Sequence, residues 1–260
     1  MDSHLITSLG DELCTALAEC RVVEPLTSRH PGLTIDDAYA IQQHLMARRL
    51  AAGEKIIGKK IGVTSQAVMD MLGVQQPDFG ILTDAMQYRD GAEIPARLLC
   101  QPKAEGEIAF RLKHDLSGPG VTASDVLGAT DSVIACFEIV ASRIRDWKIK
   151  IQDTVADNAS CGVFVIAETG VDPRRVDLVA CPLVLEKNGT VVSTGKGAAT
   201  MGSPLNAGAW LANALGRHGV VLRAGEIVLS GALGPMVPVS AGDKLRMDIA
   251  GIGGCAVRFV

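Results

Sequence analysis

Aromatic residues are scarce in this sequence, and blocks of basic residues are absent. Phe, Trp and Tyr make up 3% of the 260 residues, and the formal net charge is -4. A protein that tracks a nucleic-acid backbone usually carries a basic stripe and aromatic side chains that stack on bases. The composition therefore argues against a nucleic-acid partner.

Long uninterrupted apolar runs are also missing. No window approaches the roughly 20 uncharged apolar residues of a membrane span. The opening stretch, MDSHLITSLGDELCTALAECR, contains acidic residues and lacks the basic start and unbroken apolar core of a signal peptide. We therefore expect no membrane association and no secretion.

Cysteine pairs of the C-x-x-C type do not occur. The seven cysteines are an odd number and are scattered along the chain. This usage fits a reduced, cytoplasmic protein better than a disulfide framework or a zinc site. The positions are Cys14, Cys20, Cys100, Cys136, Cys161, Cys181 and Cys255.

What the chain does have is enough apolar material for a substantial core, with 48% hydrophobic and 21% charged residues. Its first third has helical patterns. Leucines recur every four residues from Leu5 to Leu17, Thr34 with Asp37 resembles a capping pair for a second helix that ends near Gly53, and Ser65 can cap a short third helix.

Strand patterns dominate from about residue 90 onward. Lys187-Asn188-Gly189 lies between two β-prone runs and predicts a hairpin. We therefore expect a helix-rich region over residues 1–90, which contributes an active-site strand and turn, and a β-rich catalytic domain over residues 91–260. The predicted strands are 55–63, 106–113, 132–140, 161–168, 182–195, 226–233, 244–253 and 255–260, and the predicted later helices are 122–130, 141–152 and 206–219.

Two glutamates stand one residue apart in the strand-like stretch QPKAEGEIAF. Residues i and i+2 of a strand project from the same face, so Glu105 and Glu107 are expected side by side, with Gly106 facing the other way. An exposed strand face is one explanation of this pair. The other is a packed sheet, because Ile108 and Phe110 are apolar, and there two like charges need a compensating cation.

A third carboxylate, Glu138, is the only charge in the apolar run SVIACFEIV. It is either a strand-end residue that reaches water or a buried charge with a partner or a metal. If the three carboxylates converge, the absence of a histidine or cysteine pattern favours Mg²⁺ or Mn²⁺ over zinc. The five histidines are dispersed and show no ligand spacing.

Polar residues also stand out in GKKIGVTS and QQPDFG. Lys59 and Lys60 alternate along a predicted strand, so one should point outward and one inward unless both lie at the surface. A buried lysine near a metal could orient a substrate carboxylate. Asp78 follows Pro77 in a predicted turn, where aspartates are usually structural.

Seven segments occur together and in one order: GKKIGVTS, LGVQQPDFG, EGEIAF, SRIRDWKI, TVADNASCG, GSPLNAGAWLAN and SGALGPM. On these segments the chain resembles the 2-hydroxypenta-2,4-dienoate (2-oxopent-4-enoate) hydratases of the meta-cleavage pathways that degrade aromatic compounds. This group lies within the fumarylacetoacetate hydrolase-like superfamily. The resemblance covers nearly the whole chain and implies an α+β fold, a mixed β-roll with a smaller helical N-terminal region.

The resemblance also implies roles for particular residues. Glu105, Glu107 and Glu138 correspond to the ligands of a divalent metal, Mg²⁺ or Mn²⁺, and Lys60 and Asp78 correspond to active-site residues. Lys60 is expected to orient substrate and transfer protons, and Asp78 to transfer a proton or position water. Ser160, Ser230 and Leu233 are candidate substrate contacts, with loop structure as the alternative.

The implied reaction is hydration of a 2-hydroxydienoate to a 4-hydroxy-2-oxo acid. Protonation at C5 gives a conjugated 2-oxo-3-enoate, water adds at C4, and C3 is then protonated; this sequence needs an acid and a base within reach of the substrate. The alternatives are 4-oxalocrotonate (2-oxo-3-hexenedioate) decarboxylase, which shares the metal site, and a non-catalytic partner subunit. The resemblance further implies a homo-oligomer and a complex with 4-oxalocrotonate decarboxylase.

Overall fold

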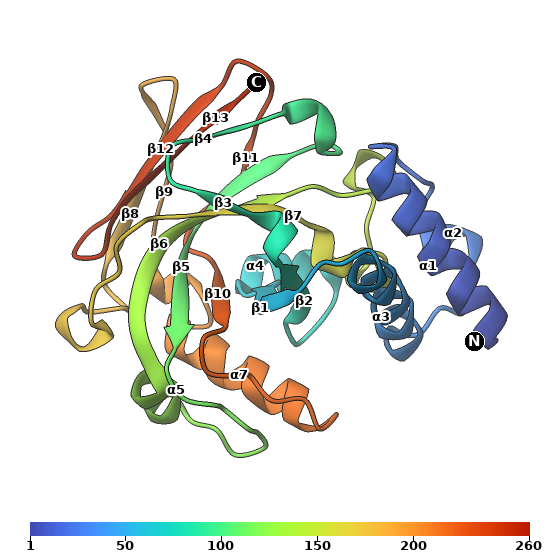
Figure 1. Cartoon of the computed structure of the whole chain (residues 1–260), viewed down its shortest axis with the longest axis horizontal. Helices are drawn as coiled ribbons and strands as arrows, with labels where there is room; N and C mark the ends of the chain where they lie inside the picture. Colours follow the sequence, from blue (N-terminus) through green and yellow to red (C-terminus); the bar gives the residue numbers. More distant parts are fainter.

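Two β-sheets form the body of the protein, and helices cover its ends (Figure 1). The computed structural model describes residues 1–260. The larger, eight-stranded sheet has the order β2-β1-β10-β5-β6-β7-β3, and β11 pairs with β5 off this path. Its strands are β1 (Ile56–Gly62), β2 (Asp78–Thr83), β3 (Gln87–Arg89), β5 (Lys103–Leu112), β6 (Thr130–Val140), β7 (Cys161–Ile166), β10 (Ile227–Ala232) and β11 (Val237–Pro238).

The second sheet has five strands in the order β4-β13-β12-β8-β9. Asn188 and Gly189 form the turn between β8 and β9, both with positive φ (54° and 81°), as the hairpin prediction requires. The strands are β4 (Ala92–Ile94), β8 (Pro182–Lys187), β9 (Thr190–Lys196), β12 (Lys244–Ile249) and β13 (Gly253–Phe259).

Six of the seven helices form two groups. α1, α2, α3 and α6 pack together at one side, whereas α5 and α7 pack on each other near β10 (Figure 1). The Thr34 hydroxyl oxygen accepts a hydrogen bond from the Asp37 N–H, and the Asp37 carboxylate accepts one from the Thr34 N–H. These two bonds confirm the predicted capping pair. The bounds are α1 (Ser3–Ala18), α2 (Leu26–Arg29), α3 (Ile35–Ala51), α4 (Gln66–Leu72), α5 (Ala123–Ala129), α6 (Ile151–Ala156) and α7 (Pro204–Gly216). None of these helices combines the length and apolar character needed to cross a membrane.

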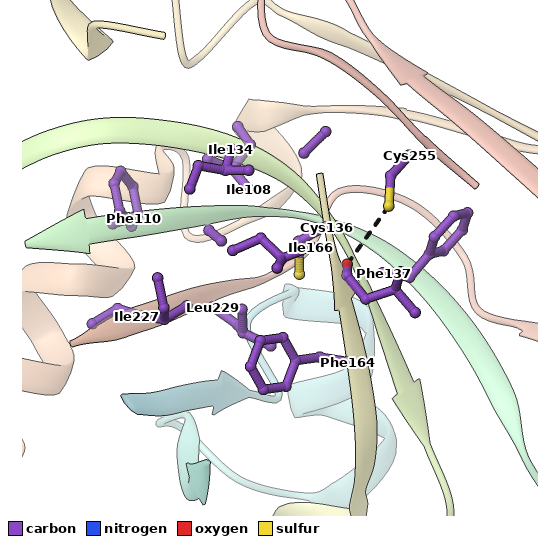
Figure 2. Packing of buried hydrophobic residues seen from close by; sticks show 14 of the residues in the cluster. Ile108, Phe110, Ile134, Cys136, Phe137, Phe164, Ile166, Ile227, Leu229 and Cys255 are labelled. Atoms are coloured by element: carbon purple, nitrogen blue, oxygen red, sulfur yellow. Dashed lines mark hydrogen bonds between the residues drawn. The ribbon is translucent and has the colours of Figure 1, made fainter. Parts of the chain in front are cut away.

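The two sheets pack face to face through an apolar layer. Figure 2 shows Phe137 and Cys255 in this layer, where the Cys255 thiol donates to the Val165 carbonyl over 3.7 Å. At Gly106 the strand packs closely against the second sheet, because a Cβ there would lie 2.8 Å from a methyl carbon of Leu183. Gly106 therefore faces the second sheet, as predicted, and its neighbours on β5 face the opposite way.

The predicted strands and the helices at 122–130 and 206–219 are confirmed, but the helix predicted over 141–152 is wrong. That segment holds a single 3₁₀ turn, Arg145–Trp147, and α6 starts only at Ile151. Asp146 and Trp147 have positive φ values (57° and 55°), and the Trp147 indole donates to the Gln101 carbonyl, so this segment follows tertiary contacts rather than its helical pattern. The division of the chain at residue 90 stays a prediction; β1 and β2, before it, share a sheet with β5 and β6, after it.

Candidate active site

Three glutamates meet on one face of the larger sheet. Glu105 and Glu107 lie two residues apart on β5, and Glu138 on β6 is the register partner of Glu105. Glu107 and Glu138 are 0% and 1% exposed. One carboxylate oxygen from each glutamate lies within 4.8 Å of the other two, so the three carboxylates form a cluster. The surface-pair explanation for Glu105 and Glu107 is therefore excluded.

An irregularity in β10 supports this cluster. The register of β10 on β5 shifts between Leu229 and Ala232, and the Gly231 N–H within the bulge donates to Glu107 Oε2 over 2.9 Å. Gly231 has φ of 101°, and a Cβ there would lie 2.4 Å from the Thr64 hydroxyl oxygen. Only glycine fits this position, which aims one backbone donor at Glu107.

Lys60 supplies the cation next to the cluster. It is 3% exposed, and its Nζ lies 3.1 Å from Glu138 Oε1, an ion pair without the geometry of a hydrogen bond. Lys59 projects from the opposite face of β1 and is also buried, with its Nζ 2.6 Å from Glu226 Oε1. The interpretation of both lysines as surface residues is therefore wrong, and Lys59 is a structural ion-pair residue.

Asp78 and Lys60 lie on the same face of neighbouring strands, where two glycines leave room for both side chains. Asp78 is the first residue of β2 rather than part of a turn, and it is 1% exposed. A Cβ on Gly62, its register partner on β1, would lie 2.2 Å from Asp78 Oδ1 and 3.4 Å from Lys60 Nζ. A Cβ on Gly80 would lie 3.3 Å from Lys60 Cε. Asp78 and Lys60 thus share the space above Gly62.

Burial dominates the ionisation of these carboxylates. It raises the pKa of Glu105 to about 7 and that of Asp78 to about 6, with the Glu138 charge adding to both and Lys60 opposing it. Burial, Glu138 and Glu105 raise the pKa of Glu107 well above its ordinary value. Burial disfavours the charge of Lys60, but Glu138 and Asp78 outweigh it and raise the Lys60 pKa.

The donor set fits a hard divalent cation. Glu107 Oε1 and Glu138 Oε1 are buried without a hydrogen-bond partner, which is costly for carboxylate oxygens unless another ligand satisfies them. Three converging carboxylates with no histidine ligand are the oxygen-rich donors that Mg²⁺ and similar ions prefer. Glu105, Glu107 and Glu138 are thus the residues that could hold such an ion.

Comparison with known proteins identifies the family of this chain. The model of the fumarylacetoacetate (FAA) hydrolase C-terminal family matches residues 60–260, which include all five clustered polar residues. The chain belongs to the fumarylacetoacetate hydrolase family. It is 55% identical over 260 residues to a 2-hydroxyhexa-2,4-dienoate hydratase from Comamonas testosteroni, covering 99% of this chain and 98% of that protein. It is 62% identical over 221 residues to a 2-hydroxypent-2,4-dienoate hydratase from Pseudomonas putida, covering 85% and 100%.

A solved structure extends the comparison to the fold. The 4-oxalocrotonate decarboxylase from Pseudomonas putida G7, complexed with magnesium and adipate, superposes with a TM-score of 0.97 at 35% identity, covering 100% of this chain and 99% of that chain. This match confirms the predicted α+β fold of the fumarylacetoacetate hydrolase type. Both hydratases and a decarboxylase are thus similar to this chain.

The three candidate substrate contacts of this fumarylacetoacetate hydrolase family member are all buried. Ser160 is 3% exposed, and its hydroxyl lies 3.1 Å from the Thr154 hydroxyl. Ser230 begins the β10 bulge, and Leu233, directly after β10, packs in the main core. Their roles in substrate binding stay predictions.

Sequence reasoning missed three residues next to the site: Arg143, Asp157 and Asn158. Arg143 is 1% exposed and forms an ion pair with Asp157, and Asn158 follows with φ of 53°. The Asp-Asn pair in TVADNASCG was the available signal, because both residues tolerate left-handed backbone and bind nearby peptides. Arg143 had no such signal, since it lay within a predicted helix.

Proposed function

We propose that this protein is a metal-dependent hydratase, a carbon-oxygen lyase, that adds water to 2-hydroxypenta-2,4-dienoate to give 4-hydroxy-2-oxopentanoate. The observation that carries the proposal is the cluster of three glutamates beside Lys60 and Asp78, in which Glu107 and Glu138 are buried and each has a carboxylate oxygen without a hydrogen-bond partner. The names of the hydratases at 55% and 62% identity support the reaction type.

Glu105, Glu107 and Glu138 are the proposed ligands of a divalent cation. Mg²⁺ is supported by the magnesium complex of the similar decarboxylase and by the all-carboxylate donor set, and Mn²⁺ is the second candidate. When bound, such an ion supplies Lewis-acid polarisation of the substrate's 2-oxo group.

Lys60 is the proposed orienting cation. Because its pKa is raised, it stays protonated at neutral pH and can hold the substrate carboxylate while its charge balances Glu138. Its stem packs near Gly80, which restricts where the ammonium can lie. Proton transfer to the substrate chain is the second role we propose for Lys60; it would require the Lys60 pKa to fall, as a cation that neutralises Glu138 would cause.

Asp78 is the proposed group that exchanges protons with substrate or water. Burial raises its pKa to about 6, so it is close to the pH at which a carboxyl both gives and takes protons. Neither of its oxygens has a hydrogen-bond partner, which leaves both available to a substrate carbon or the attacking water. The reaction needs such a group at several points: the 2-hydroxyl loses a proton while C5 gains one, and the water that adds at C4 loses a proton while C3 gains one.

Further parts of the proposal concern the surroundings of the reaction. Ser160, Ser230 and Leu233 are the proposed substrate contacts. We place the protein in the cytoplasm, in the meta-cleavage degradation of aromatic compounds, as a homo-oligomer and as a partner of 4-oxalocrotonate decarboxylase. Size measurement of the purified protein, alone and mixed with that decarboxylase, tests both assembly statements.

Decarboxylation is the second candidate reaction, because the decarboxylase superposes over the whole chain. Its 35% identity is lower than that of the named hydratases, which favours hydration. The test supplies 2-hydroxypenta-2,4-dienoate, its hexadienoate homologue and 2-oxo-3-hexenedioate in separate assays with Mg²⁺. We expect the diene absorbance of the pentadienoate and of the hexadienoate to fall, and EDTA to prevent this fall. Release of CO₂ from the hexenedioate without hydration of either dienoate would overturn the proposal.

A further inference from the structure

The strand that carries Asp78 lies at the edge of the larger sheet. β2 pairs with β1 on one side only, so the peptide groups on its other side have no strand partner. Asn158 fills this place at Ile81. Its Oδ1 accepts from the Ile81 N–H over 2.8 Å and its Nδ2 donates to the Ile81 carbonyl over 2.9 Å. One amide side chain thus forms hydrogen bonds with both the N–H and the carbonyl of Ile81, as the backbone of a neighbouring strand would.

A second amide completes this edge. Gln42 on α3 donates to the Phe79 carbonyl over 2.9 Å and to the Val155 carbonyl over 3.0 Å. The outward-facing carbonyls at Phe79 and Ile81 are therefore both paired with side chains. Asn158 is the only one of the two amides that also receives an N–H from β2.

The backbone of Asn158 is itself held firmly. Asn158, Ala159 and Ser160 have consecutive positive φ values of 53°, 52° and 54°, a run that needs support from its surroundings. The support comes from Arg143, whose backbone N–H and Nε donate to the Asp157 carboxylate and whose Nη2 donates to the Asp157 carbonyl over 2.6 Å. The Asn158 amide therefore contacts β2 from a backbone segment that Arg143 and Asp157 hold in place.

Asp78 depends on β2 for its position. Neither of its carboxylate oxygens has a hydrogen-bond partner of normal geometry, so the path of the strand and the packing around it largely set the direction of this carboxylate. The Asn158 carbonyl also covers Gly80, since a Cβ there would lie 2.7 Å from it. A shift of β2 away from β1 would therefore move Asp78 relative to Lys60.

We infer that Asn158 is a positioning residue for Asp78: its side-chain amide fixes the β2 edge at Ile81 and thereby sets the geometry of proton exchange. This inference rests on the proposed function. The metal ligands lie on β5 and β6, which Asn158 does not bind through its side chain. Its effect is thus on proton exchange and not on metal binding.

The test is Asn158→Gly, which removes the amide and keeps the left-handed backbone accessible. We expect kcat to fall roughly 10- to 100-fold, as a small misplacement of a reacting group does, with KM changed less than about threefold. Calorimetry should show an unchanged Mg²⁺ dissociation constant, and hydrogen exchange at the Ile81 amide should become faster. Asn158→Asp keeps the acceptor for the Ile81 N–H and should give a kcat between those of the wild type and Asn158→Gly. This variant provides the test if Asn158→Gly does not fold.

Asn213 provides a matched control. On α7 it pairs in the same way with one residue, accepting from the Val121 N–H over 2.9 Å and donating to the Val121 carbonyl over 2.8 Å, away from the site. Asn213→Ala should speed exchange at Val121 and leave kcat unchanged. The inference is overturned if Asn158→Gly keeps the wild-type kcat, or if its Mg²⁺ affinity falls in parallel with kcat. If the wild-type protein hydrates no dienoate, the proposed function is wrong. In that case the rate of hydrogen exchange at the Ile81 amide, in the wild type and in Asn158→Gly, decides whether Asn158 holds β2.

Discussion

Two buried ion pairs in this protein differ in whether the polar atoms around them have hydrogen-bond partners. Around Arg143 and Asp157, both carboxylate oxygens accept hydrogen bonds, and the guanidinium also donates to three backbone carbonyls. Around Lys60 and Glu138, buried oxygens of Asp78, Glu107 and Glu138 lack hydrogen-bond partners. Both arginine and lysine are nearly inaccessible, at 1% and 3% exposure.

The difference separates a structural pair from a functional one. Burying charge is tolerated in a fold when the charges satisfy each other, as Arg143 and Asp157 do. Burial raises the pKa of Asp157 to about 6 while Arg143 lowers it, so the pair is ionised at neutral pH. Buried charges without hydrogen-bond partners lower the stability of the fold unless a bound ligand pairs with them. Such groups therefore indicate a functional site.

The largest effect is expected when a ligand of the unsatisfied cluster is neutralised. Glu107→Gln keeps the shape of the side chain but removes a metal-binding charge, so hydratase activity should fall by about 10³-fold or more. The metal-free variant should melt at the same temperature as wild type or higher, because a repelled, buried carboxylate is gone. Activity assays and thermal melts with EDTA measure both. A large drop in metal-free stability with activity retained would show that Glu107 is structural.

The opposite result is expected for the satisfied pair. Asp157→Asn leaves the Arg143 guanidinium buried without its counter-charge, which should lower the free energy of unfolding by about 3–5 kcal/mol. Urea unfolding of the metal-free protein measures the change. Arg145 and Glu24 form a matched pair at the surface, with side chains 48% and 58% exposed. Glu24→Gln should cost less than about 1 kcal/mol; equal losses at both pairs would contradict the comparison.

The unsatisfied cluster should also make metal binding depend on pH. The raised pKa of Glu105, about 7, means that protons compete with the cation below neutrality. Raising the pH from about 5.5 to about 8 deprotonates this carboxyl, so the increase in melting temperature caused by Mg²⁺ should be larger at the higher pH. Thermal melts with and without Mg²⁺ at each pH measure it. An increment that is equal or larger at low pH would contradict the assignment.

A small effect is also expected on the far side of β5, the strand that carries Glu105 and Glu107. Gly106→Ala adds a methyl group that meets only the flexible ends of Leu183 and Met247. These side chains can adjust, so the loss of unfolding free energy should be about 1 kcal/mol, with Mg²⁺ affinity unchanged. Urea unfolding and calorimetry test this. A loss of metal binding would show that the two faces of β5 are coupled.

Local patterns in the sequence predicted much of the fold because their causes are local. The period of two put Glu105 and Glu107 on one face, the Thr34 capping pair fixed the start of α3, and Asn188 with Gly189 fixed the β8–β9 turn. The family resemblance then predicted the roles of the residues now found together. Composition and spacing alone could not have chosen between a surface pair and a buried cluster.

The rest depended on contacts between distant segments. Lys60 reaches Glu138 only because β1 pairs with β10, β10 with β5 and β5 with β6 in one sheet, an order that no local pattern contains. The 141–152 segment looked helical, but its side chains bind the Gln101 region and its Arg143 turns inward to Asp157. Asn158 acts on β2 through an amide, and its sequence signal is only that of a turn residue.

The most direct test of the central claim is anomalous diffraction from crystals of the wild-type protein grown with Mn²⁺ in place of Mg²⁺. We predict one strong peak within bonding distance of Glu105, Glu107 and Glu138, about 2.2 Å from a carboxylate oxygen of each. The same crystals of the Glu107→Gln variant should lack it. No peak at these glutamates in the wild type, or a peak bound elsewhere, would contradict the account.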